Sequence, residues 1–533
     1  MKQLIASLLL FAAMIISPAH AAIDPAMLQG LAADDSDDKI AAIAKVAALA
    51  DADALRVLTA MSKDNLMAAG DKLYVADGDK LTDAATGAAV DARPAGLDTL
   101  TINNRVRSAL DSALAGLRLF STSRDKRLAA ARELQDSADE ALLPLLERAL
   151  KSEQDAAIRD MLQIARAVAT LQSADGAIRL QAAKDLSASS NPAVKSMLLA
   201  RLQKQGDAYA EPDDKVRAEI EDAIKQIDKR LARADALSRI FTGLSLGSIL
   251  LLAALGLAIT YGVMGVINMA HGELLMVGAY AAYAMQGVFR AHWPNYTDWY
   301  LVAAIPVAFF AAAAVGVLME RTVIRFLYGR PLETLLATWG LSLVLIQAAR
   351  VLFGAQNVEV ANPGWMSGAI EVLPNVVLPW NRIIIIGFAA FVLSLVWLLM
   401  NRTRLGMFVR AVTQNRSMAG CVGVPTARID TLAFAIGAGI AGLGGLALSQ
   451  IANVGPDMGQ GYIVDSFMVV VLGGVGQLAG AVWAAMGLGV ATKFLEGWAG
   501  AVIAKILVLV FIIVFIQKRP QGLFAMKGRF VES

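Results

Sequence analysis

Three polar side chains interrupt a hydrophobic stretch in the second half of this 533-residue chain. The stretch reads YGVMGVINMAHGELLMVGAY over residues 261–280 and contains Asn268, His271 and Glu273. Amide, imidazole and carboxylate groups are costly in hydrocarbon unless they face a cavity or a partner, and each of them can form hydrogen bonds with a small polar molecule. The pattern therefore predicts a broken or pore-lining element in a protein that moves something across a membrane.

Glycines surround these polar groups. Gly262, Gly265 and Gly272 loosen a helix, and non-helical backbone at membrane depth is tolerated where it lines a cavity. Two roles stay open for the polar side chains. They could line a transport pathway or its inner gate, or they could form a structural cap between two helices. One carboxylate and one imidazole do not make a proton relay.

Other polar side chains lie in hydrophobic segments further along the chain. Thr338 and Ser342 could contact a small amide, although hydroxyls in membrane helices often bond their own backbone instead. Asp465 could meet an external partner or act as the N-cap of a helix. Lys493 and Glu496 are three residues apart and could pair on one helix face.

The composition excludes several classes of function. The chain is 57% hydrophobic with a mean hydropathy of +0.55, and its net charge of +2 comes without a basic, aromatic-rich patch, so no nucleic-acid partner is expected. The single cysteine, Cys421, excludes an internal disulfide and a multi-cysteine metal site. The sequence contains neither HExxH nor a GxxxxGKS/T phosphate loop. We therefore expect no metal, no cofactor and no enzyme activity, and any ATP-driven step needs another polypeptide.

The first residues have the form of a secretory signal. Lys2 precedes an apolar core at 4–16, and Ala19-His20-Ala21 forms a small-residue cleavage site. We predict a signal peptide over 1–21. The alternative is a short membrane anchor, and in either case the following domain is exported.

Residues 22–239 are predicted to form an exported helical domain. The pattern Ile40–Val46 recurs loosely at Leu128–Leu134 and Leu180–Leu186, which favours stacked helix pairs of the HEAT-like kind. An ordinary helical bundle with alanine-rich contacts is the alternative. A β-hairpin is expected within 71–93. No catalytic constellation occurs here, and we interpret the domain as a docking platform outside the membrane.

Residues 240–533 are predicted to form a polytopic transmembrane bundle, so that the fold class is all-α. Nine hydrophobic segments near the required length are expected to cross the membrane. They lie at about 243–263, 272–290, 301–320, 334–354, 382–400, 430–450, 463–477, 480–495 and 499–517. The seventh and eighth are short and glycine-interrupted, as in discontinuous helices beside a pathway, although a single long kinked helix is the alternative.

The loop charges indicate an orientation. Lysine and arginine gather in 321–330, 402–428 and 518–529, which the positive-inside rule places in the cytoplasm together with the C-terminus. The 355–381 segment contains neither residue and is expected outside. Three arginines between 230 and 239 oppose this orientation, but a folded exported domain behind a signal sequence can override that bias. We therefore expect a multi-pass protein of a bacterial inner membrane with a periplasmic N-terminal domain.

The basic loop at 402–430 is long enough for a short helix. Its apolar and polar residues alternate as in a short amphipathic helix, with Gly406, Arg410 and Arg416 as candidate contacts to a cytoplasmic motor. We interpret it as a coupling helix for an ATPase. The alternative is a basic loop anchored on membrane lipid.

Three ordered motifs in the membrane part carry a family resemblance. They are the 261–280 stretch, the loop RTRLGMFVRAVTQN…GVPTARID, and VVVLGGVGQLAGAVWAA. Residues 240–525 resemble the inner-membrane permeases of branched-chain amino acid ABC importers. The resemblance implies an assembly with a second homologous permease, two ATPase subunits and a periplasmic substrate-binding protein.

Within that family the chain is most similar to the urea-importing branch. RPLETLLATWGLSLVLIQ, VGPDMGQGYIVDSFMVVV and FIQKRPQGLFAMKGR carry this likeness, as does the large exported extension. The resemblance implies an ATP-driven importer of urea. A branched-chain amino acid or short-amide importer is the alternative, and a passive urea or amide channel is another. A channel would need no coupling loop, so residues 402–430 favour the importer.

Overall fold

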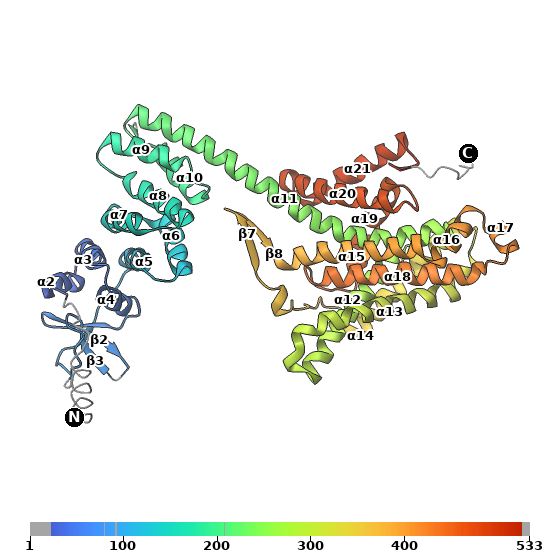
Figure 1. Cartoon of the computed structure of the whole chain (residues 1–533), viewed down its shortest axis with the longest axis horizontal. Helices are drawn as coiled ribbons and strands as arrows, with labels where there is room; N and C mark the ends of the chain where they lie inside the picture. The colour runs from blue at the N-terminus through green and yellow to red at the C-terminus, as the bar shows by residue number, and fades with distance from the viewer. Residues whose placement is uncertain (1–22, 79, 91–92, 207, 525–533) are drawn as a thin grey trace, which may run out of the picture. The chain divides into compact units, whose positions relative to one another are not determined.

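The computed structural model describes residues 23–78, 80–90, 93–206 and 208–524. The predicted signal peptide, 1–21, lies outside these residues. The chain divides into two compact units between Ala232 and Arg233, and each unit is described by itself. One long helix, α11 (Asp214–Met264), crosses this division in the sequence (Figure 1).

The N-terminal unit consists mostly of short helices whose ends the sequence specifies. Aspartate or asparagine side chains accept hydrogen bonds from first-turn N–H groups and so begin many of them, as Asp51, Asn103 and Asp155 do. The helices are α2 (Pro25–Gln29), α3 (Ser36–Ala48), α4 (Ala52–Ser62), α5 (Asn104–Arg118), α6 (Arg124–Ser137), α7 (Leu143–Ser152), α8 (Ala156–Thr170), α9 (Gly176–Leu186) and α10 (Pro192–Arg201), with 3-10 turns at Gly30–Ala32 and Glu140–Leu142.

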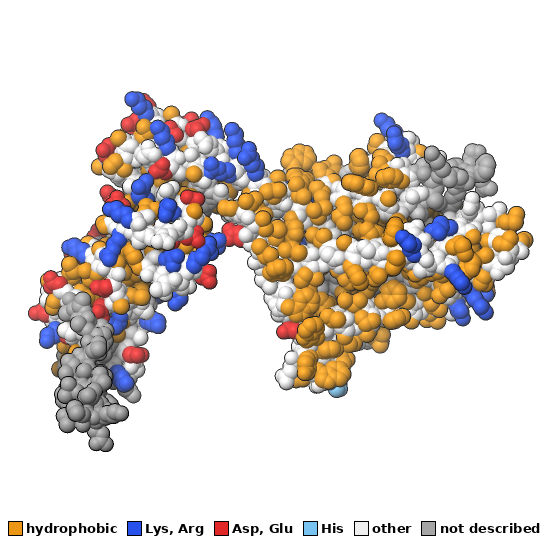
Figure 2. Space-filling model, viewed as in Figure 1, with side chains coloured by type: hydrophobic (Ala, Val, Ile, Leu, Met, Phe, Trp, Pro, Cys, Tyr) orange, Lys and Arg blue, Asp and Glu red, His pale blue; other side chains and the backbone are white. Residues whose placement is uncertain are grey.

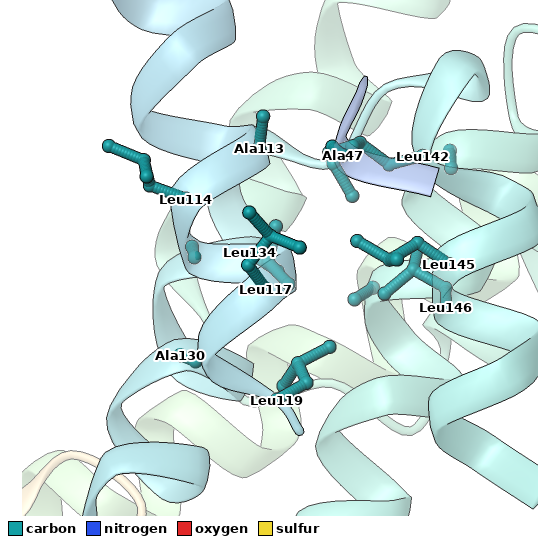
Figure 3. Close-up of a cluster of buried hydrophobic side chains, with 14 of the residues drawn as sticks. Ala47, Ala113, Leu114, Leu117, Leu119, Ala130, Leu134, Leu142, Leu145 and Leu146 are labelled. Carbon is teal, nitrogen blue, oxygen red and sulfur yellow. The ribbon is translucent and has the colours of Figure 1, made fainter. Parts of the chain in front are cut away.

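Alanine and leucine side chains form the core of this unit. Figure 3 shows Leu117 of α5 and Leu134 of α6 side by side, with Leu145 and Leu146 of α7 opposite them, and Ala47, Ala113 and Ala130 belong to the same core. Gly116 permits such an approach, since a Cβ there would lie 2.3 Å from Leu145 Cδ2. The first half of α11 completes this core through Val216 and Ile220. Small residues thus bring the helices close enough for the leucines to interdigitate.

A small antiparallel sheet interrupts the helices of the N-terminal unit. Its order is β3-β2-β1-β4, with strands Leu66–Ala69, Lys72–Asp77, Lys80–Asp83 and Asp98–Thr99 numbered β1 to β4 in chain order. The β2–β3 hairpin confirms the strand pair predicted within 71–93. A second pair joins β5 (Lys204–Gln205) to β6 (Ala208–Tyr209). The prediction of an all-α fold is therefore corrected to a mostly helical one.

In the C-terminal unit a helix lies at each of the nine predicted segments. After α11 they are α12 (His271–His292), α13 (Tyr300–Thr322), α14 (Pro331–Phe353), α15 (Trp380–Arg402), α18 (Thr426–Ser449), α19 (Met458–Gly473), α20 (Leu478–Ala499) and α21 (Ala501–Lys518). Within the described residues, seven helices are long and apolar enough to cross a membrane. α12 falls short in hydropathy because it carries polar residues, and α19 has only 16 residues. The count of nine crossings stays a prediction.

Shorter elements connect these helices. Two short helices, α16 (Arg404–Gln414) and α17 (Arg416–Cys421), occupy the basic loop, and the hairpin of β7 (Ala369–Leu373) and β8 (Val376–Pro379) lies in the connection that contains no Lys or Arg. Helical 3-10 turns lie at Pro294–Trp299, Ile324–Phe326 and Gly364–Met366.

Glycine packing brings the helices of this unit together. A Cβ at Gly445 of α18 would lie 1.8 Å from the Leu275 oxygen of α12, and one at Gly278 of α12 would lie 2.0 Å from the Gly442 oxygen. The glycines of α18 therefore serve helix–helix contact, as the small-residue spacing predicts. Between α19 and α20, Gly474 has φ of 99° and ends the helix, so the two segments are separate helices rather than a single kinked one.

The outer surface of the C-terminal unit is apolar. Figure 2 shows hydrophobic side chains over much of its visible face. Exposed members include Leu336, Val344 and Val351 of α14 and Phe511 and Val514 of α21. Such an apolar exterior is what contact with lipid requires.

Candidate functional site

The predicted break between the first two membrane segments is confirmed. α11 ends at Met264, Gly265 takes φ of 66°, and α12 begins at His271. Residues 265–270 are therefore non-helical backbone inside an otherwise helical unit. Such backbone is tolerated at membrane depth only where protein or a cavity satisfies its polar groups.

Asn268 forms the turn of this break and keeps part of its amide free. Its Oδ1 accepts a hydrogen bond from the Ala270 N–H at 3.1 Å, and its backbone oxygen accepts from the His271 N–H at 3.3 Å. The side chain is 1% exposed, and its Nδ2 has no hydrogen-bond partner. The Asn268 side chain therefore closes the turn before α12 and leaves one buried donor without a partner.

His271 opens α12 and is fully buried. Its Nε2 lies 3.0 Å from the Ala253 oxygen of α11 and donates to it, which leaves Nδ1 as an acceptor without a partner. Gly256 makes room for the ring, because a Cβ there would lie 3.0 Å from His271 Cε1. The imidazole therefore links α12 to α11 through Nε2 and leaves Nδ1 buried without a partner.

Glu273 pairs with a residue of α14. Its Oε1 accepts a hydrogen bond from Ser342 Oγ at 2.8 Å, while its Oε2 has no partner although the residue is 1% exposed. Gly459 of α19 admits this carboxylate, since a Cβ there would lie 2.7 Å from Oε2. The structure therefore brings together two residues that lie 69 positions apart and that the sequence singled out separately.

Thr338 joins the same cluster through the backbone of the break. Its Oγ1 donates to the Thr334 oxygen at 2.8 Å and accepts from the Met269 N–H at 3.1 Å. Thr334, Thr338 and Ser342 are spaced four apart and form a polar, buried stripe on α14. Thr338 thus bonds its own helix, as one interpretation predicted, and it also satisfies the break; its contact with a small amide stays a prediction.

The cluster therefore combines unpaired donors and acceptors around one carboxylate. Asn268 offers an N–H, while His271 and Glu273 offer acceptors. No metal-binding group of three His, Cys, Asp or Glu occurs in the described part of the chain. The chemistry available to these groups is hydrogen bonding.

A second buried polar network lies outside the sequence prediction. Gln286 Nε2 and Tyr300 Oη both donate to the Ala361 oxygen, at 3.0 and 2.8 Å, and Tyr300 Oη lies 3.3 Å from Gln450 Oε1. Asn381 Nδ2 donates to the Gln450 oxygen at 3.2 Å. In the sequence, the polar Gln286 within an apolar segment could have indicated this network. This network ties the connection after α14 to the ends of α12, α13 and α18.

Charged side chains line a cavity between α11, α19, α20 and α21. Its volume is about 450 Å³. Lys493 Nζ donates to Glu496 Oε2 at 2.5 Å, which confirms the predicted pair, and Lys505 Nζ lies 3.5 Å from Asp465 Oδ2. Asp465 lies well inside α19, so the prediction that it acts as an N-cap is wrong. It faces a lysine instead.

The candidate coupling residues lie on α16 and α17. α16 buries Gly406, Val409 and Val412 on one side and so confirms the amphipathic helix. A Cβ at Gly406 would lie 2.0 Å from the Met400 oxygen, so this glycine packs against the end of α15 and is not itself a surface contact. Arg410 is exposed and donates through Nη1 to the Met400 oxygen at 2.6 Å.

Arg416 is the least free of the three candidates. Its guanidinium donates to Asp430 of α18 and lies over the Tyr328 ring, 4.5 Å from its centroid. Burial, with Asp430 nearby, raises the pKa of Tyr328 above its ordinary value. Sequence reasoning did not single out Asp430 or Tyr328, because their role depends on contacts that span 14 and 88 residues of the chain.

Comparisons with known proteins match the C-terminal unit. The profile described as "Branched-chain amino acid transport system / permease component" matches residues 239–516. The "High-affinity branched-chain amino acid transport system permease protein LivH" of Salmonella typhimurium is 30% identical over 294 residues, which is 54% of this chain and 94% of the relative. The corresponding protein BraD of Pseudomonas aeruginosa is 29% identical, over 54% of this chain and 95% of the relative. No solved structure matches the chain.

Proposed function

The chain belongs to the branched-chain amino acid transport permease family, and we propose that within it this protein is the permease subunit of an ATP-driven importer of urea. As a member of that family it is a multi-pass membrane permease component and not an enzyme. The urea assignment draws on the resemblance of the 330–347, 454–471 and 515–529 segments to the urea-importing branch. The relatives named above are described as branched-chain amino acid permeases, so an amino acid is the competing cargo.

The polar break is the observation that carries this proposal. Urea is small and neutral, and it both donates and accepts hydrogen bonds. The free N–H of Asn268 and the free acceptor nitrogen of His271 match those groups one to one. Thr338 and Ser342 hold the break and the Glu273 carboxylate in place. A leucine would instead need a larger apolar cavity and separate partners for its two charged ends.

The proposed pathway requires only weak contacts. Each hydrogen bond to a passing urea contributes about 0.5–1.5 kcal/mol net, so several of them can select the cargo without trapping it. Tight binding would prevent release. In this account selection over solutes without N–H groups comes from Asn268, His271 and Glu273 acting together.

In this proposal the ATP-hydrolysing subunits are separate polypeptides. We propose that α16 and α17 dock on an ATPase, with Arg410 exposed toward it and Gly406 and Arg416 holding the segment in place. A second homologous permease, two ATPase subunits and a periplasmic binding protein complete the assembly that the family implies. ATP binding would favour one orientation of the permease pair, and hydrolysis would reset it.

The orientation follows from the loop charges. Residues 22–239 would be periplasmic, with helix pairs stacked in the HEAT-like manner and a docking function, while 240–533 would form the permease with nine crossings and a cytoplasmic C-terminus. Labelling of introduced cysteines in intact cells tests this, in a Cys421→Ser background. A cysteine at Ser123 should react with a membrane-impermeant reagent, and one at Ser417 should not; the reverse would contradict the orientation.

Uptake by the complete complex tests the cargo. Proteoliposomes that contain both permeases, the ATPases and the binding protein should accumulate urea only with ATP, and excess leucine should not compete. Accumulation of leucine without urea would show that the cargo is an amino acid and leave the importer class intact. Urea flux that is independent of ATP would indicate a passive channel.

A further inference from the structure

Four elements meet where the basic loop returns to the membrane helices. Arg416 of α17 forms an ion pair with Asp430 of α18 and covers the ring of Tyr328, which lies between α13 and α14. Next to Asp430, Thr431 Oγ1 donates at 2.8 Å to Glu320 Oε2 of α13. We name the set Tyr328, Arg416 and Asp430 the clasp.

The buried carboxylate of Asp430 is the centre of the clasp. Asp430 is 1% exposed, and Arg416, whose side chain is 39% exposed, is its only charged partner in the described residues. The other carboxylate oxygen has no hydrogen-bond partner. A buried carboxylate is strongly disfavoured without its counter-charge, so Asp430 holds the guanidinium, and with it α17, in one position. The planar guanidinium also stacks on the Tyr328 ring, which a lysine could not reproduce.

We propose that Asp430 and Tyr328 are positioning residues that set the coupling segment, α16 and α17, against α18 and α14 through Arg416, so that movement of the segment is passed to the membrane helices. This inference rests on the proposed docking of that segment on an ATPase. Asp430 itself does not touch the ATPase or the cargo. Its role is to make α17 and the start of α18 move as one piece.

A continuous series of contacts leads from the clasp to the polar break. Tyr328 precedes α14, and Thr334 Oγ1 of α14 donates back to the Leu327 oxygen at 3.0 Å. On the same face Thr338 accepts from the Met269 N–H of the break, and Ser342 donates to Glu273. α14 is otherwise largely exposed and apolar, and these polar contacts join its buried stripe to the break, while Phe353 stacks on Tyr280 of α12 further along the helix. A shift of Tyr328 would therefore be carried along α14 to the proposed pathway.

Neutral variants of the ion pair test the coupling. In the complete complex, Asp430→Asn and Arg416→Gln should each lower the urea moved per ATP hydrolysed by about tenfold. Hydrolysis and ATPase binding should persist. Arg416→Lys keeps the positive charge but loses the planar guanidinium and its stacking on Tyr328. Its ratio of urea moved to ATP hydrolysed should therefore lie between those of Arg416→Gln and the parental complex. Glu320→Gln is the matched control, since it neutralises another buried carboxylate at the same level while keeping an acceptor for Thr431, and the ratio should not change.

A double variant separates positioning from folding. Arg416→Gln with Asp430→Asn should be no worse than the worse single variant, because removing both partners leaves no buried unpaired charge. A parental ratio in both single variants would overturn the inference. So would a loss of ATPase binding or of assembly in proportion to uptake, because that result would mean a folding role.

Hydrogen exchange in the isolated chain provides a readout that needs neither ATP nor cargo. Asp430→Asn should raise exchange in residues 404–421 severalfold, and Glu320→Gln should not. Equal exchange in the two variants would refute the clasp even if urea transport were shown. If the complex proved to carry another cargo, this comparison would still decide the role of Asp430.

Discussion

The two units of this chain both bury apolar cores, but they differ in how fully their buried polar atoms are paired. The N-terminal unit buries leucine and alanine, and its few buried polar groups are largely paired, as in the bidentate contact of Arg179 with Glu211 at 2.8–3.2 Å. The C-terminal unit also exposes many large apolar side chains, and it buries Asn268, His271 and Glu273, each with one atom unpaired. Among the described residues, one buried side-chain atom of the N-terminal unit, Arg56 Nη1, has no hydrogen-bond partner, whereas eight such atoms lie in the C-terminal unit.

This difference indicates where function lies. A buried polar atom without a partner costs about 1–3 kcal/mol, and it persists where a ligand, a neighbouring chain or a movement uses it. The N-terminal unit is stabilised by helix caps and apolar contacts, which suits the docking role proposed for it. Four of the eight such atoms in the C-terminal unit belong to the helix break and to Asp430, where the proposals place cargo and coupling; the others belong to Ser245, Tyr280, Gln286 and Tyr328.

The largest expected effect comes from closing a backbone contact in the C-terminal unit. Gly445→Val places a side chain where a Cβ alone would lie 1.8 Å from the Leu275 oxygen, which no rotamer can relieve. We expect little folded protein, measured as the monodisperse fraction in detergent. Gly487→Val in α20 is the control, because nothing lies within 4 Å of its Cβ. Equal yields of the two variants would contradict the glycine-packed account.

A smaller effect is expected in the leucine core of the N-terminal unit. Leu134→Ala removes a fully buried side chain and should lower the local stability of α6 and α8 by about 2–5 kcal/mol, measured in the full chain by hydrogen exchange. Leu199→Ala, at a position that is 42% exposed, should change it little. If the two variants exchanged alike, the core would not be the source of this unit's stability.

The smallest effect is an acid dependence of α6, α7 and α8. Burial raises the pKa of Glu153, but hydrogen bonds from Arg127 and from two backbone N–H groups outweigh it and place the pKa below 4.5, its ordinary value. The hydrogen bond from Arg124, together with the N–H groups of α8 that Asp155 caps, lowers the pKa of that carboxyl below 3.8.

The lowered pKa values of Glu153 and Asp155 make the folded state less stable in acid. Carboxyl groups with depressed pKa values stabilise the folded state fully above their ordinary values, and this contribution is lost as the pH falls below about 4.5 and then 3.8. Hydrogen exchange of α8, corrected for its intrinsic rate, should therefore rise in that range. Glu153→Gln should remove part of the dependence. A parental chain whose exchange is flat down to pH 3 would refute the contribution of these ion pairs.

Much of the fold was predictable because local rules and hydropathy agree. Apolar runs located the membrane helices, and Gly265 with Asn268 located the break. The β2–β3 hairpin followed from its turn residues. The β1 and β4 strands were missed because two- to four-residue strands depend on partners elsewhere in the chain. The site was harder to predict, since Ser342 meets Glu273 only through helix packing.

The coupling candidates show the same limit. The amphipathic pattern located α16, but it could not show that Gly406 packs against Met400 or that Arg416 is held by a buried aspartate. Asp430 is the fifth residue of an apolar helix, and the sequence pattern alone gives no reason to select it. The contact with Arg416, which the sequence does not show, is what makes Asp430 a candidate for coupling.

The central claim is that the polar break lies on the urea pathway, and Asn268→Leu in the complete, ATP-driven complex tests it most directly. The substitution removes the free N–H and adds an apolar side chain in a fully buried place. We predict that the initial rate of urea uptake falls about tenfold, with the ATPases still bound. Ser394→Leu, at an exposed position on α15, serves as the control and should keep the parental rate. An Asn268→Leu complex that assembles and takes up urea at the parental rate would contradict the account.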